Sequence, residues 1–62
     1  MERFIEWVDA RQNAVLKAKR LNMDMAIRRV KEYGKDGFNV TIASRNDSDY
    51  ARAEIVTPSD PI

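Results

Sequence analysis

The sequence contains neither cysteine nor histidine. Without cysteine there can be no disulfide bond, and without both residues there can be no ordinary zinc site of the kind that stabilises many small domains. The same absences remove the most common general base and the best nucleophile of enzymes. We therefore expect a non-enzymatic protein with no catalytic residues, no metal and no cofactor.

Glycine and proline are also absent from residues 1–33, more than half of the 62-residue chain. Such a stretch permits a continuous helix of about 50 Å at 1.5 Å per residue. Phe4, Trp7, Val8 and Val15 recur at helical spacing, with charged residues on the opposite side. The apolar side shifts its centre at Met23, so a break within residues 21–24 is the alternative to one long helix that ends at residue 33.

After residue 34 the apolar period changes from helical to alternating. Phe38, Val40 and Ile42 alternate with polar or small residues, which is typical of a half-buried strand. Residues 45–49 form a polar turn, and residues 50–57 alternate well enough to return as the second arm of a hairpin. A short helix in residues 51–54 is the competing interpretation. Pro58 ends the ordered part, leaving residues 58–62 as a frayed tail.

These patterns predict one α+β domain over residues 1–57, with one long or once-broken amphipathic N-terminal helix followed by a C-terminal β-hairpin. A domain this small buries only about 60% of its unfolded surface, and the predicted helix is longer than the hairpin can cover. We therefore expect a homodimer. The apolar residues expected at protein interfaces are Trp7, Val15, Met23 and Met25.

The first helical turns carry Glu2, Glu6 and Asp9 among their apolar residues. Acidic residues at this spacing exclude the apolar core of a signal peptide and a membrane-spanning segment. We expect a soluble, cytoplasmic protein with no membrane partner. The same acids favourably meet the positive end of the helix dipole, which explains them without catalytic chemistry.

Charge is distributed unevenly, although the formal net charge is only +1. Residues 11–31 contain seven basic side chains and one acidic side chain, whereas residues 36–62 contain two basic and five acidic ones. A basic helical part beside an acidic C-terminal part polarises the molecule, and such polarity favours docking to a charged partner.

Residues 18–33 also permit a DNA-binding interpretation. Ala18, Leu21 and Asn22 match the small, apolar and turn positions of a helix-turn-helix, so residues 26–31 would form the helix presented to a groove, with the hairpin as a wing. Asparagine in place of the usual turn glycine and an early Ile27 depart from that pattern. A solvated basic helix face explains the same residues without DNA. The nucleic-acid contacts in this interpretation are Lys17, Arg20, Arg28, Arg29 and Lys31.

The leading hypothesis from the sequence is a protein-interaction module that binds and modulates another protein. A short accessory or inhibitory protein of phage or mobile-element type fits this description. A small DNA-binding regulator is the alternative. Neither hypothesis identifies the partner.

Overall fold

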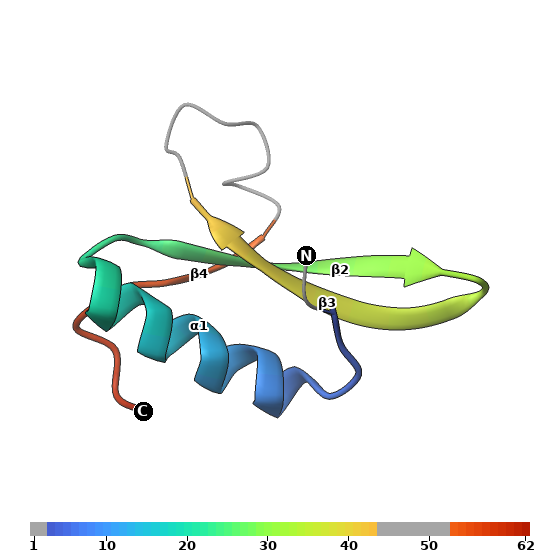
Figure 1. The fold of residues 1–62 in the computed structure, drawn as a ribbon, viewed down its shortest axis with the longest axis horizontal. Helices are drawn as coiled ribbons and strands as arrows, with labels where there is room; N and C mark the ends of the chain where they lie inside the picture. Colours follow the sequence, from blue (N-terminus) through green and yellow to red (C-terminus); the bar gives the residue numbers. More distant parts are fainter. Residues whose placement is uncertain (1–2, 44–52) are drawn as a thin grey trace.

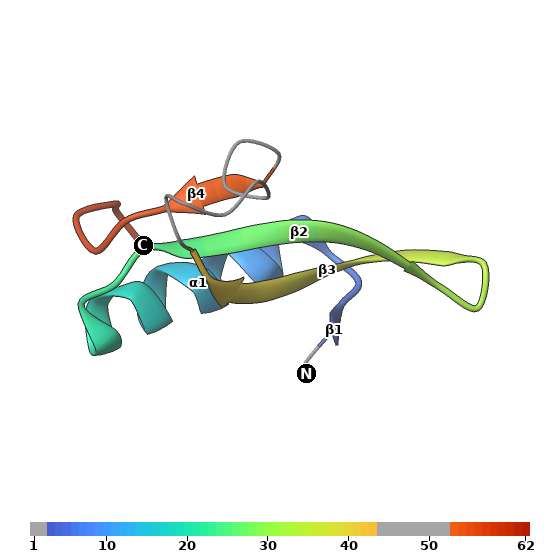
Figure 2. The same cartoon turned by 90° about the horizontal axis from the view of Figure 1, so that it is seen from above.

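The structure is a computed structural model that describes residues 3–43 and 53–62. Its elements are β1 (Arg3–Phe4), α1 (Trp7–Leu21), β2 (Met25–Glu32), β3 (Lys35–Ile42) and β4 (Glu54–Val56). The strands form one antiparallel sheet in the order β1-β3-β2-β4, and α1 packs on one face of it (Figures 1 and 2). The predicted α+β class is confirmed.

The helix ends at Leu21 because Asn22 adopts the left-handed conformation, with φ = 53°. Asparagine tolerates this conformation better than most residues do, and the Met23 amide then donates to the Ala18 carbonyl at 3.1 Å. The prediction of one helix reaching residue 33 is therefore wrong, and the once-broken alternative is correct only in that the helix ends within residues 21–24. No described helix is long and apolar enough to cross a membrane.

A strand, not a second helix, follows the break. Met25 and Ile27 lie on the helix-facing side of β2, and this strand pairs with β3 along its whole length, from Met25 opposite Ile42 to Glu32 opposite Lys35. Eight residues are too few for the apolar period alone to distinguish a helix from a strand. Pairing with β3 therefore determines that residues 25–32 are a strand. Gly34, which directly follows the predicted end of the long helix, instead lies in the two-residue turn of the β2–β3 hairpin.

The predicted strand at residues 38–42 is present as the second half of β3, but its predicted partner is wrong. β4 pairs with β2, with Met25 opposite Val56 and Ile27 opposite Glu54. The predicted turn at residues 45–49 and the start of the predicted second arm, residues 50–52, lie outside the described residues. The hairpin of the structure is thus formed by β2 and β3, not by two C-terminal strands. β4 lies beside β2, on the edge of that strand that faces away from β3.

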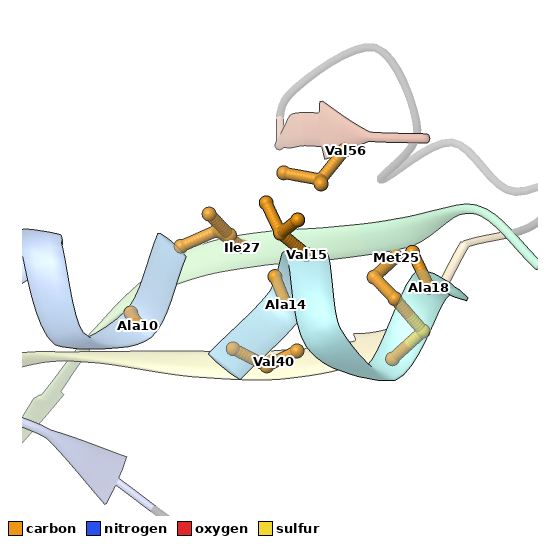
Figure 3. Close-up of a cluster of buried hydrophobic side chains, with 8 residues drawn as sticks. All are labelled: Ala10, Ala14, Val15, Ala18, Met25, Ile27, Val40 and Val56. Atoms are coloured by element: carbon orange, nitrogen blue, oxygen red, sulfur yellow. The ribbon is translucent and has the colours of Figure 1, made fainter. Parts of the chain in front are cut away.

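The core lies between α1 and the sheet, as Figure 3 shows. It consists of Ala10, Ala14, Val15, Ala18, Met25, Ile27, Val40 and Val56. Three of its four helical residues are alanines, and their short side chains let the helix backbone approach the strands closely. Phe4 and Phe38 pack against this cluster. The middle of the apolar side of α1 is therefore covered by the chain's own sheet, whereas Trp7 and Val8 at its start stay 38% and 68% exposed.

Long side chains join residue 3 to the β2–β3 hairpin and α1 to the C-terminal residues. The Arg3 guanidinium donates to the carbonyl oxygens of Lys35 and Asp36, at 2.9 and 3.0 Å. It lies over Gly37, where an added Cβ would be only 2.6 Å from Arg3 Nε. Only glycine gives the arginine this space.

In the predicted tail, the carbonyl oxygens of Pro58 and Pro61 accept hydrogen bonds from α1. Lys19 Nζ donates to Pro58 at 2.9 Å, and the Arg11 guanidinium donates to Pro61 at 3.2 Å. The Thr57 amide also donates to the Asp60 carboxylate at 3.0 Å. Residues 57–61 thus contact α1 and one another.

Val15 and its neighbour Leu16 test this packing, because the first is fully buried and the second is 48% exposed. We expect Val15→Ala to lower the free energy of unfolding by about 2 kcal/mol, since it removes two buried methyl groups and leaves a cavity. Val15→Asp should prevent folding, because it buries an unpaired charge. Leu16→Ala should change the free energy by less than about 1 kcal/mol. Urea titrations measure these differences, and equal effects at both positions would contradict the packing.

Candidate functional site

The β2–β3 hairpin extends well past α1 and the other strands, and its turn lies at one extreme of the molecule (Figures 1 and 2). All residues from 28 to 36 are exposed except Val30, which is half-buried. The outer half of this hairpin, residues 28–38, is called the hairpin arm below. It is held in one conformation by its strand pairing, yet the core covers little of it.

The end of the hairpin arm carries Tyr33, whose side chain is 97% exposed. Tyr33 and Gly34 form the two-residue turn, with φ angles of 52° and 76°. Two positive φ angles are typical of a type I′ turn, whose twist matches the flanking strands and whose first position favours asparagine, aspartate or glycine. A bulky tyrosine in this conformation is strained. Its nearly complete exposure shows that packing within the chain does not offset that strain.

The charges of the hairpin arm divide between two faces of the sheet. Because side chains alternate along a strand, Arg29 and Lys31 lie on the face that α1 covers farther along, whereas Arg28 lies on the opposite face. The Arg29 guanidinium carbon lies 5.9 Å from the centroid of the Phe38 ring, a cation–π contact. Lys31 is directly opposite Asp36 in the register.

The opposite face of the arm carries an ion pair to β1. Arg3 Nε lies 3.7 Å from a carboxylate oxygen of Glu32. Glu32 is also opposite Lys35 in the register. The acidic residues of the arm are therefore close to basic ones, and because the arm has four basic and two acidic side chains its net charge is positive.

The five predicted nucleic-acid contacts do not form one surface. Lys17 and Arg20 are on α1, while the other three are divided between the faces of β2. The helix-turn-helix interpretation of residues 18–33 is wrong, because residues 18–21 finish α1 and residues 25–32 are a strand. The proposed wing is also wrong, since the described C-terminal strand does not pair with β3.

Two of the four predicted interface residues are inside the chain's own core. Val15 is fully buried and Met25 is 2% exposed, so neither offers a surface to a partner. Met23 is 42% exposed in the turn between α1 and β2. Trp7 is 38% exposed, and its indole nitrogen donates to Glu54 Oε2 at 2.8 Å, which joins the start of α1 to β4.

Tyr33 is not among the residues that the sequence patterns singled out. The available signal was the pair Tyr33 and Gly34 between residues 25–32 and 35–42, two stretches of equal length that can both be strands. The lack of glycine and proline before residue 34 directed the interpretation toward a helix. A strand, however, needs neither residue in its interior.

One further depression lies along α1, a shallow groove of about 250 Å³ lined by Phe4, Asp9, Gln12, Asn13 and Leu16. Within residues 3–43 and 53–62, no three acidic side chains are grouped closely enough to hold a metal ion. Comparisons of the chain with protein-family models, curated proteins and solved structures give no match. Functional inference therefore depends on geometry and chemistry.

Replacing Tyr33 tests whether its conformation is strained. We expect Tyr33→Asn to raise the free energy of unfolding by about 1 kcal/mol, because asparagine adopts positive φ more readily. Tyr33→Ala serves as a control that removes the ring and keeps a residue disfavoured at positive φ, so it should change stability much less. Thermal and urea unfolding measure both variants. A loss of stability in Tyr33→Asn would mean that the ring supports the fold.

Proposed function

We propose that this protein is a small non-enzymatic interaction module that binds and modulates another protein by inserting its hairpin arm into a recess of that partner. The observation that carries the proposal is Tyr33, a strained aromatic residue that is 97% exposed at the end of the arm. Occupying a recess is one way in which an accessory or inhibitory protein can act.

Three properties of the arm support this proposal. Tyrosine and arginine are enriched among the residues that dominate protein interfaces, and both are present here. Strained conformations of single residues cluster at binding sites, where function maintains them against a cost in stability. The arm is also preformed by the pairing of β2 with β3, so little conformational entropy is lost when it binds.

The arrangement of cations makes nucleic acid the weaker candidate. Binding along a duplex favours several basic side chains on one surface, whereas Arg28 and Arg29 are on opposite faces of β2. Two further cations of the basic segment, Arg11 and Lys19, already donate to carbonyl oxygens of the C-terminal residues. Self-association stays a separate prediction, and the core inside one chain covers only part of the helix face that motivated it.

Site-specific crosslinking in an extract of the native host tests the proposal. Replacing Tyr33 with photoreactive p-benzoylphenylalanine should crosslink one host protein, because the side chain enters that protein's recess. The matched control places the same group at Leu16, which is 48% exposed on α1 and outside the arm. Unlabelled wild-type protein should compete with crosslinking at position 33, and the Tyr33→Asn variant should not. Equal products from both positions, or competition by the variant, would contradict insertion of Tyr33.

A DNA-binding measurement separates the two functions. We expect no tight complex with a duplex of about 30 base pairs at about 150 mM salt, because the basic side chains are dispersed and acidic residues accompany them. Fluorescence anisotropy measures this binding. A tight complex that is lost when Arg28, Arg29 and Lys31 are all changed to glutamine, without loss of thermal stability, would favour the DNA-binding alternative.

A further inference from the structure

The outer edge of β2 has backbone groups that point away from the sheet. The Ala43 amide donates to the Asp24 carbonyl at 3.0 Å, which extends the β2–β3 register by one residue and turns Asp24 toward β3. In an antiparallel ladder, inward and outward residues alternate. Met25, Ile27, Arg29 and Lys31 therefore direct their N–H and C=O groups away from β3, toward the side where β4 lies.

β4 occupies only the first part of this edge. Its first residue, Glu54, lies opposite Ile27. In the part of the chain that the structure describes, no strand lies beside Arg29 or Lys31, and both residues are exposed. Among residues 3–43 and 53–62, the outward main-chain groups of Arg29 and Lys31 therefore have no strand partner, and they lie in line with β4.

The charge of this edge selects against a second copy of the chain. If two β2 edges paired antiparallel about Val30, Arg29 of one copy would lie opposite Lys31 of the other, and directly opposed like charges are destabilising. Basic side chains on edge strands prevent such self-pairing in many proteins. The same charges attract a strand that carries acids.

We propose that the edge of β2 at residues 29–31 binds an extended acidic segment of a partner protein as an added strand, in continuation of β4. This inference depends on the proposed function, because it defines the partner of the same hairpin arm. Main-chain hydrogen bonds to Arg29 and Lys31 hold the segment. Every second side chain of the segment is acidic and faces those two cations, and an apolar side chain between them lies beside Val30.

Amide hydrogen exchange of the whole protein, followed by NMR, tests strand addition directly. The probe is an end-capped peptide of about eight residues in which glutamate and valine alternate. Binding should slow the exchange of the Arg29 and Lys31 amides specifically, because these amides point outward. The Val30 amide already donates toward β3 and should change little. A lysine–valine peptide of equal length is the matched control and should protect neither amide.

Two substitutions at position 31 separate backbone pairing from charge. Lys31→Pro removes an outward amide that the β2–β3 ladder does not use, and proline is tolerated on edge strands, so peptide binding should be lost while the fold is kept. Lys31→Glu keeps the amide and reverses the charge, so it should weaken binding of the acidic peptide about tenfold. If Lys31→Pro does not fold, strand addition is tested by the affinity of Lys31→Glu together with the exchange rates of the Arg29, Val30 and Lys31 amides.

The proposal is overturned if the acidic peptide binds without protecting the two amides, or if a folded Lys31→Pro variant binds it as tightly as wild type. A third outcome also overturns strand addition. If duplex DNA binds as tightly as the peptide and shifts the same resonances, and neither ligand protects the two amides, the edge attracts any polyanion. Failure of the peptide together with successful crosslinking at position 33 would refute the added strand alone. Protection by the peptide together with failed crosslinking would refute insertion of Tyr33 alone.

Discussion

The close contact between the alanine-rich side of α1 and the sheet is the constraint on which this fold depends. Ala10, Ala14 and Ala18 bring the helix backbone near the strands, and Val15 fills the space toward β2 and β4 (Figure 3). With so few large side chains in the core, each buried methyl group accounts for a large share of the stability of a 62-residue domain. The sheet must therefore present complementary residues on one face only, which fixes the register of all its strands.

That constraint also leaves part of the sheet uncovered. A 15-residue helix is about 22 Å long, and the β2–β3 hairpin runs past its beginning (Figure 1). The part of this hairpin beyond the helix is the hairpin arm, and no helix or strand that the structure describes packs over it. Arg29 lies over Phe38 there, and the ion pair of Glu32 with Arg3 joins the outer end of the arm, next to its turn, to β1. Local side-chain contacts thus replace a core in holding the arm.

Local signals predicted the parts of the fold that local physics determines. The apolar residues of α1, the alternation in residues 38–42 and the strand character of residues 54–56 were all recognisable. Pairing partners were not, because the choice between β2 and β3 as the neighbour of β4 depends on which edge is free after the sheet assembles. The secondary structure of residues 25–32 was predicted wrongly for a different reason. Their apolar residues at 25, 27 and 30 fit a helix period and a strand period almost equally, and only the pairing with β3 separates the two. Tyr33 was missed because its exposed position in a tight turn follows from that hairpin.

The two edge strands come from opposite ends of the chain, while the two central strands are consecutive. Arg3 can pair with Asn39 only when the 35 residues between them form a closed loop. Glu32 and Lys35, in contrast, are separated by a two-residue turn. Closing a short loop loses less entropy than closing a long one, and local pairings form within microseconds. The central hairpin is accordingly the unit best suited to form first, and the terminal segments then add to a template whose register is already set.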